Sequence, residues 1–190
     1  VMSAFEAFEQ TFGRDHEWGD LRDARVESCT FEGADWSGLD LRGARFEDCV
    51  FRDCDLSNVR ALGLGLQDVT FEGCKLVGFD LASCNTLGLE VRLTDCMLDS
   101  ANLEGVDCRQ ISWKGGQAHG ADFTAANLEG VVFDGVDLEG ALFGQTKLTG
   151  TDFRTATGWL IRPDENRMRG AKFRRDGLEG LLSAYDLDLE

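Results

Sequence analysis

The sequence predicts an all-β solenoid of about eight four-sided coils that ends in a short α-helix. Two regularities carry this expectation. Large apolar residues recur at every fifth position through most of the 190 residues, and most of the 23 glycines fall two positions after one of them. A period of five fits neither the 3.6-residue turn of a helix nor the two-residue repeat of a strand. We therefore expect a chain that turns a corner every five residues, so that four corners close a coil of about 20 residues.

Residues 1–18 precede the regular period, and we expect an irregular first coil that caps the solenoid. Four aromatic residues lie outside the frame in this segment: Phe5, Phe8, Phe12 and Trp18. A solenoid needs such a cap because its terminal coil otherwise exposes apolar side chains and unpaired backbone groups.

Residues 19–158 form the predicted β-helix. The apolar residues at every fifth position, here called centres, run from Leu21 to Leu81 in one frame and from Leu93 to Phe153 in another. Because the frames differ by two residues, we place an insertion of two residues, or a seven-residue loop, within 86–93. Each centre should point inwards and stack on the centre one coil earlier. The aromatic centres then form a core ladder of Phe31, Phe51, Phe71, Trp113, Phe123, Phe133, Phe143 and Phe153.

The residue two positions before each centre is usually small and should also point inwards. Six of the seven cysteines occupy this position, and the seventh, Cys108, is a centre. We expect these cysteines to be buried free thiols. The sequence has no CxxC pair and no histidine near the cysteines, so we expect no metal site and no cofactor. Four large residues stand where small ones are expected and are candidates to widen a coil: Leu39, Leu64, Phe79 and Ile111.

These repeats resemble those of the pentapeptide-repeat family, whose motif is A-(D/N)-L-x-x. Unit follows unit over about residues 19–158, whereas a single five-residue match would carry no information. The resemblance implies a right-handed quadrilateral β-helix. The units that carry it most clearly are Ala34-Asp35-Trp36, Cys54-Asp55-Leu56, Ala101-Asn102-Leu103, Ala121-Asp122-Phe123 and Ala126-Asn127-Leu128.

Residues 159–190 depart from the period, and we expect an irregular last coil, a short α-helix and an extended tail over 187–190. Pro163 marks a loop, and Asp176 with Glu179 three positions later resembles a capping box at a helix start. Apolar side chains then recur at helical spacing. In the drug-resistance branch of the family the C-terminal segment forms a symmetric dimer, so the resemblance implies a homodimer. We place its interface at Leu178, Leu181, Leu182 and Tyr185.

Acidic residues dominate the solvent positions of the repeats. The chain has 35 acidic residues against 19 Lys and Arg, a net charge of -16, which excludes a free-standing nucleic-acid binder because like charges repel. A rod of about eight coils is about 38 Å long, and duplex DNA of that length carries about 22 negative charges. One interpretation is that these acids only keep the protein soluble. The alternative is that they form a DNA-mimicking surface that binds a protein partner. The candidate residues of this surface are Asp99, Glu104, Asp107, Asp122, Glu129, Asp134, Asp137, Glu139 and Asp152.

The size of the chain and its C-terminal helix resemble the group that contains Qnr, MfpA, AlbG and McbG. The resemblance implies binding to DNA gyrase or topoisomerase IV, with protection from quinolones or immunity to peptide toxins such as albicidin. The long projecting loop of many Qnr proteins is missing, which favours plain gyrase inhibition, or immunity to one natural toxin, over protection from quinolones. The alternative function is a structural or interaction module with another partner, because a fold alone does not define function.

Neither catalysis nor membrane insertion is expected. The two histidines, His16 and His119, have no nucleophile at motif spacing, and the sequence contains no phosphate-binding loop. No apolar run approaches the roughly 18 residues of a membrane helix, and no signal peptide opens the chain. We therefore expect a cytoplasmic, non-enzymatic protein.

Overall fold

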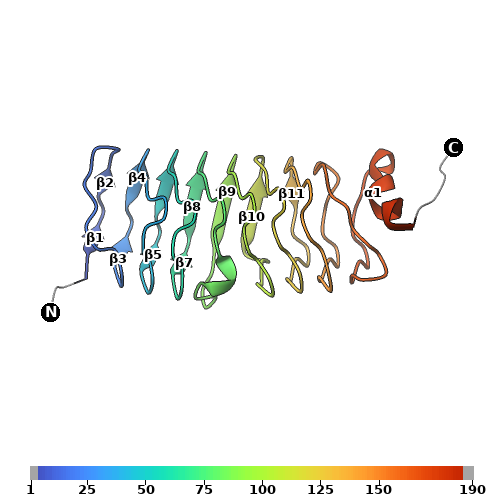
Figure 1. The fold of residues 1–190 in the computed structure, drawn as a ribbon, viewed down its shortest axis with the longest axis horizontal. Helices are drawn as coiled ribbons and strands as arrows, with labels where there is room; N and C mark the ends of the chain where they lie inside the picture. Colours follow the sequence, from blue (N-terminus) through green and yellow to red (C-terminus); the bar gives the residue numbers. More distant parts are fainter. Residues whose placement is uncertain (1–3, 186–190) are drawn as a thin grey trace.

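The computed structural model describes residues 4–185 and shows one elongated stack of coils, with the two chain ends at opposite ends of the stack (Figure 1). Strands of successive coils pair in parallel. Val26 lies beside Phe46, and Phe46 lies beside Leu66, so each step of the register is one full coil of four repeats. This register is the one that a period of five with four corners predicts. The predicted fold class, a β-solenoid with one short C-terminal α-helix, is confirmed.

Two sides of the coil form parallel sheets. The first sheet contains, in order, β1 (Glu6–Phe8), β3 (Arg25–Glu27), β5 (Arg45–Glu47) and β7 (Gly65–Gln67). The second sheet contains, in order, β2 (Thr11–Phe12), β4 (Thr30–Glu32), β6 (Val50–Arg52), β8 (Val69–Glu72), β9 (Val91–Thr94), β10 (Ile111–Lys114) and β11 (Phe133–Asp134).

The other two sides are joined by single parallel bridges instead of continuous strands. We call one of them the Asp35–Thr157 side and the other the Asp40–Leu142 side. The first is a ladder of Asp35, Asp55, Lys75, Met97, Gln117, Asp137 and Thr157. The second includes the bridges Asp40 to Arg60, Asp80 to Asn102, Asn102 to Asp122, and Asp122 to Leu142.

The core is a column of stacked side chains inside the coil. Phe51 stacks on Phe31 with ring centroids 4.6 Å apart, and Phe71 stacks on Phe51 at 5.0 Å. These distances match the separation of neighbouring parallel strands, so each ring meets the equivalent ring of the next coil. All eight residues of the expected core ladder are buried.

The small inward-pointing residues fit inside the narrow coil, and some of them also donate hydrogen bonds to backbone carbonyl groups. The thiol of Cys54 donates to the carbonyl oxygen of Phe31 at 3.4 Å, and the thiol of Cys74 donates to that of Phe51 at 3.3 Å. The hydroxyl of Thr146 makes the equivalent bond to the carbonyl oxygen of Phe123 at 2.9 Å. A small side chain with a weak or strong donor therefore satisfies a buried carbonyl group. All seven cysteines are free and buried.

The coil widens in the segment where the sequence predicts the frame shift. Asn85 still pairs with Gly65 at the regular spacing of one coil, but Val91 pairs with Val69, which adds two residues to the coil between them. The extra residues form an outward bulge that follows η1 (Leu81–Ser83), drawn in green in Figure 1. The phenyl ring of Phe79, which is buried at a small-residue position, lies immediately before this wider coil.

The N-terminal segment is a coil that is one residue short. Glu6 pairs with Arg25 and Thr11 pairs with Thr30, so each pair is one residue closer in sequence than the pairs of the regular coils. The ring of Phe12 stacks on Phe31 at 5.4 Å and so covers the first rung of the core ladder.

The C-terminal segment contains η2 (Arg175–Gly177), α1 (Glu179–Leu182) and η3 (Ser183–Tyr185). The expected capping box is wrong. Asp176 lies inside η2, two residues before Leu178, the N-cap residue of α1, and its carboxylate accepts hydrogen bonds from the Arg174 guanidinium at 3.1 and 2.7 Å. The N-cap residue of α1 has no side-chain cap. The extended tail expected at 187–190 lies outside the described residues.

Within residues 4–185, no helix is long and apolar enough to cross a membrane.

Candidate functional site

The nine candidate acidic residues lie on all four sides of the rod. Glu104 and Asp122 lie on the Asp40–Leu142 side, and Asp134 and Asp152 lie on or beside the second sheet. Asp107 and Glu129 lie on the continuation of the first sheet, where Asp107 pairs with Asn127. The remaining three, Asp99, Asp137 and Glu139, lie on the Asp35–Thr157 side, where His119 lies between Asp99 and the other two.

Many aspartates are paired within their own repeat. An aspartate directly before a centre accepts hydrogen bonds from an arginine directly after it, as in Asp40 with Arg42 at 2.6 Å and Asp107 with Arg109 at 2.6 Å. These arginines lower the pKa of both carboxyl groups, that of Asp40 to about 2. The acidic surface is therefore neutralised at these positions by neighbours in the same turn.

Asp152 corrects the expectation that every acid before a centre faces solvent. Its side chain is buried, with the Arg154 guanidinium at 2.7 Å and the Lys172 ammonium at 4.0 Å. Two cations in contact, one of them bidentate, hold the carboxylate against the coil, and the Arg154 hydrogen bonds lower its pKa. Asp152 is therefore a structural ion-pair residue and is removed from the candidate surface.

The Asp35–Thr157 side keeps most of its negative charge. Between Asp35 and Glu139, the outward positions of this side carry five acids and a single Lys or Arg, Lys75, whose ammonium lies 3.8 Å from Asp55. Asp35 instead accepts hydrogen bonds from the backbone and hydroxyl of its own turn. The acids of this side are Asp35, Asp55, Asp99, Asp137 and Glu139.

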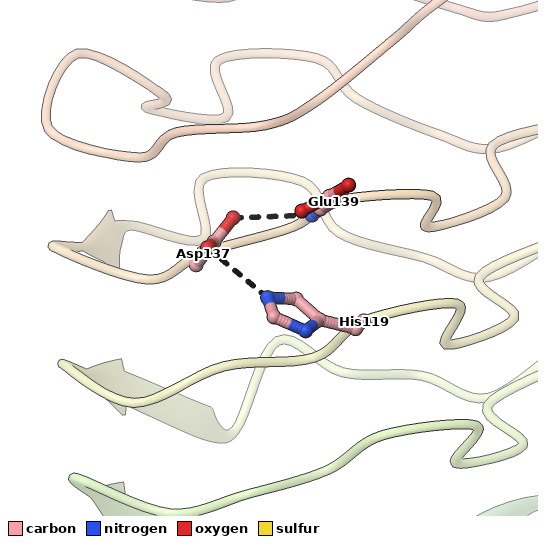
Figure 2. Close-up of side chains that lie close together, drawn as sticks. All are labelled: His119, Asp137 and Glu139. Atoms are coloured by element: carbon pink, nitrogen blue, oxygen red, sulfur yellow. Dashed lines mark hydrogen bonds and ion pairs between the residues drawn. The ribbon is translucent and has the colours of Figure 1, made fainter.

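Figure 2 shows the tightest group on this side, in which His119 meets two acids of the next coil. The Nε2 atom of His119 lies 3.0 Å from Oδ2 of Asp137. The Oδ1 atom of Asp137 accepts the backbone N–H of Glu139 at 3.2 Å. Contact with the Asp137 carboxylate raises the pKa of His119. The order of residues along the chain gives no sign of this group, because its members come from two coils.

Gly158, in the following coil, packs closely against the turn formed by Asp137 and Glu139. Its φ is +70°, and a Cβ atom there would lie 2.5 Å from Oδ1 of Asp137 and 2.8 Å from the backbone nitrogen of Glu139. Any side chain at this position would push against the Asp137 turn, so the glycine allows the close approach of the two coils.

The apolar residues of the C-terminal segment are only partly exposed. Leu178 and Tyr185 are 40% and 41% exposed, whereas Leu181 is half-buried and packs against the core. The Tyr185 hydroxyl donates to Asp164 at 2.9 Å, which ties η3 to the loop after the last coil. Of the four residues expected at a dimer interface, Leu178 is the most available apolar side chain, with Leu182 half-buried beside it.

Charge is distributed unevenly along the rod. From Lys147 to Tyr185 the chain has eight Lys or Arg residues and five Asp or Glu, whereas the preceding residues have 11 and 27. The segment 147–185 is therefore basic and does not continue the acidic surface. The excess of acidic residues lies in the preceding part of the rod.

The family model described as pentapeptide repeats matches residues 20–58 and 119–154, in eight copies. No curated protein matches the chain in sequence.

Three solved structures illustrate the similar proteins. Trypsin-treated QnrB1, a plasmid-mediated fluoroquinolone resistance protein, is 18% identical over 98% of both chains, with a TM-score of 0.49. HetL from the cyanobacterium Nostoc, a pentapeptide repeat protein involved in heterocyst differentiation regulation, is 20% identical over 87% of this chain and 81% of HetL, with a TM-score of 0.34. A pentapeptide repeat protein of the Arabidopsis thaliana thylakoid lumen is 26% identical over 70% of this chain and 71% of that protein, with a TM-score of 0.18.

The matched repeats cover parts of both halves of the chain and coincide with regular four-sided coils. The chain therefore contains pentapeptide repeats over residues 20–58 and 119–154, and the same four-sided coil continues between them.

Proposed function

We propose that this chain is a DNA mimic that binds the basic duplex-binding groove of a type II topoisomerase, DNA gyrase above all, in the cytoplasm. The observation that carries the proposal is the Asp35–Thr157 side, which has five acids and one lysine along the rod. The role is binding, with no catalytic step. It would protect gyrase from a quinolone or a peptide toxin by occupying the place of DNA.

The length of this side suits such a partner. Asp35 and Asp137 are five coils apart, which is about 24 Å, the length of about seven base pairs of duplex DNA. A groove that encloses a duplex also touches neighbouring sides of it, so acids on the adjoining sides add to the interaction. The net charge of -16 steers association with a basic groove over a longer range.

The second candidate function is an interaction module with a different partner. It is favoured by the internal pairing of acids such as Asp40 and Asp107 with arginines, because acids that stabilise their own turn are not free to imitate phosphates. The basic segment 147–185 also offers a surface that a mimic of an anionic duplex does not need.

Binding to purified gyrase, measured while duplex DNA competes, tests the proposal. We expect saturable binding that duplex DNA displaces and that weakens as salt rises. Polyglutamate at matched charge is the control, and it should compete far less well because it lacks the rigid spacing of the rod. Absence of binding, or binding that DNA leaves unchanged, would favour the interaction module. Supercoiling assays with a quinolone or albicidin then separate protection from simple inhibition.

A further inference from the structure

We propose that His119, Asp137 and Glu139 form a binding site for a divalent transition-metal ion, with zinc as the best match. One ligand atom from each residue lies within 4.8 Å of the other two (Figure 2). Imidazole nitrogen with two carboxylate oxygens is a donor set that suits zinc, and three protein ligands leave a further position open for water or for a partner. The site does not depend on the proposed DNA mimicry.

The separation of the donors fits one shared ion. Two ligands at zinc distances of about 2.0–2.1 Å in tetrahedral geometry lie about 3.3 Å from each other. The Nε2 atom of His119 and the Oδ2 atom of Asp137 are 3.0 Å apart, so an ion between them needs only a small adjustment. Glu139 has an exposed side chain, and rotation of its carboxylate closes the remaining gap.

The imidazole nitrogen that would bind the ion contacts only the Asp137 carboxylate among the described residues, and it makes no aligned hydrogen bond. The Nε2 atom of His119 is shielded from solvent and has no hydrogen-bond partner among the described residues, because its close contact with Asp137 is poorly aligned for one. A shielded polar atom without a partner costs free energy. A metal ion between Nε2 and Oδ2 would satisfy it.

The other ring nitrogen of His119 faces a supporting layer. Its Nδ1 atom lies 3.4 Å from the Gln117 amide nitrogen and 3.9 Å from Oδ1 of Asp99. The Gln117 amide donates to both Asp99 oxygens, at 3.0 and 2.8 Å, and the backbone N–H of His119 donates to Oδ1 at 3.2 Å. Metal-binding histidines commonly have a carboxylate on the side away from the metal, and Asp99 lies on that side, beyond hydrogen-bond distance of Nδ1.

The stacking of coils brings the ligands together, which explains why no linear motif reveals them. Asp137 and Glu139 flank the centre Leu138, and the parallel bridge between Gln117 and Asp137 places His119 beside them. His119 and Asp137 are distant in sequence, and only the return of the chain after one full coil makes them neighbours. The seven buried thiols lie inside the coil, so the donors at this surface are nitrogen and oxygen alone.

Calorimetric titration of the full chain with Zn²⁺, after treatment with a chelator, tests the site. We expect one Zn²⁺ per chain, a higher melting temperature with Zn²⁺ present, and no comparable binding of Mg²⁺. Cobalt serves as a spectroscopic probe, and its bound spectrum should lack the charge-transfer absorption of thiolate ligands. His119→Gln and Glu139→Gln should each weaken Zn²⁺ binding at least about tenfold, since even outer partners of a metal commonly have an effect of that size.

His16→Gln and Glu129→Gln are the matched controls, because each removes the same chemical group elsewhere on the rod. Both should bind Zn²⁺ like the original chain. Circular dichroism without metal establishes that each variant is folded. Equal Zn²⁺ binding by the original chain, His119→Gln and Glu139→Gln would overturn the proposal, as would failure of the original chain to bind or a thiolate signal in the cobalt spectrum.

Discussion

Phe133 stacks on Phe153 across one coil, with ring centroids 5.3 Å apart and ring planes inclined by 19°. Phe133 is fully buried, and its ring also meets Trp113 at 5.3 Å. We expect Phe133→Ala to lower the free energy of unfolding by about 3–5 kcal/mol, because it leaves a cavity in a column that cannot close around it. The exposed neighbour Asp134→Ala should change it by no more than about 0.5 kcal/mol. Urea denaturation measures both, and equal losses would contradict the inward and outward assignment.

The corners of most repeats adopt a left-handed backbone, and this conformation gives a second prediction. Ala125 occupies a corner with φ of 57°, whereas Gly130 occupies the next corner with φ of 72°. Because a left-handed conformation costs a non-glycine residue about 1–2 kcal/mol, Gly130→Ala should destabilise the chain by about that amount. A Cβ at Gly130 meets no atom within 4 Å, so the effect comes from the backbone alone.

Ala125→Gly is the reciprocal change. The relief of backbone strain should slightly exceed the entropic cost of glycine, about 0.5–1 kcal/mol, so the melting temperature should not fall. A lower melting temperature in Ala125→Gly, together with an unchanged one in Gly130→Ala, would mean that corner conformation does not control stability.

The Asp40–Arg42 pair predicts acid sensitivity. The Arg42 guanidinium lowers the pKa of Asp40 to about 2 in the folded chain, below its ordinary value of 3.8. A lowered folded-state pKa contributes stability above the unfolded value, and this contribution is lost as pH falls from about 4 to about 2. In Asp40→Asn, the midpoint of urea unfolding should therefore decline less steeply between about pH 4 and about pH 2. A slope equal to that of the original chain would exclude this pair as a source of acid sensitivity.

Dimerisation through the C-terminal segment is the fourth prediction. Light scattering should give a mass near twice 20.9 kDa. Leu178→Glu should give a folded monomer, because it puts a charge on the most available apolar side chain of this segment. Leu87→Glu is the control, since Leu87 is 88% exposed and belongs to the bulge after η1, which Figure 1 shows far along the rod from α1. If the full-length chain remains monomeric at high concentration, the dimer prediction is wrong and α1 only covers the C-terminal end of the solenoid.

The period of five was enough to predict the coil and the core ladder, because burial of one column fixes the register of every repeat. Phe31, Phe51 and Phe71 stack as the spacing requires. Individual surface positions could not be predicted in the same way. Asp152 has the same place in its repeat as Asp137, yet the first is buried between two cations and the second meets a histidine of the preceding coil.

Part of the difference lies in the repeat itself, because Arg154 follows Asp152 where Glu139 follows Asp137. The other partners, Lys172 and His119, come from neighbouring coils, about 20 residues away in sequence. A repeat motif defines which residues point outwards but not which neighbours they meet. The failure of Asp176 to cap α1 has a local origin instead, because the N-cap residue of α1 is Leu178 and Asp176 pairs with Arg174 two positions away.

The central claim is that the acids of the Asp35–Thr157 side imitate DNA. Asp35→Asn, Asp55→Asn, Asp137→Asn and Glu139→Gln together remove four of its charges. Folding should survive, because Asn102 and Asn127 already accept the same turn hydrogen bond at equivalent positions. The control removes four charges elsewhere from exposed glutamates without ion pairs among the described residues: Glu6, Glu9, Glu27 and Glu47, each changed to Gln.

The affinity of these two variants for gyrase, measured with a chelator present and as a function of salt concentration, tests the claim most directly. The four-residue variant of the Asp35–Thr157 side should bind far more weakly than the control, with a flatter salt dependence because fewer charges are matched. The control should keep most of the affinity although its net charge is the same. Equal affinity and equal salt dependence in the two variants would contradict the claim and assign the acids of this side to solubility.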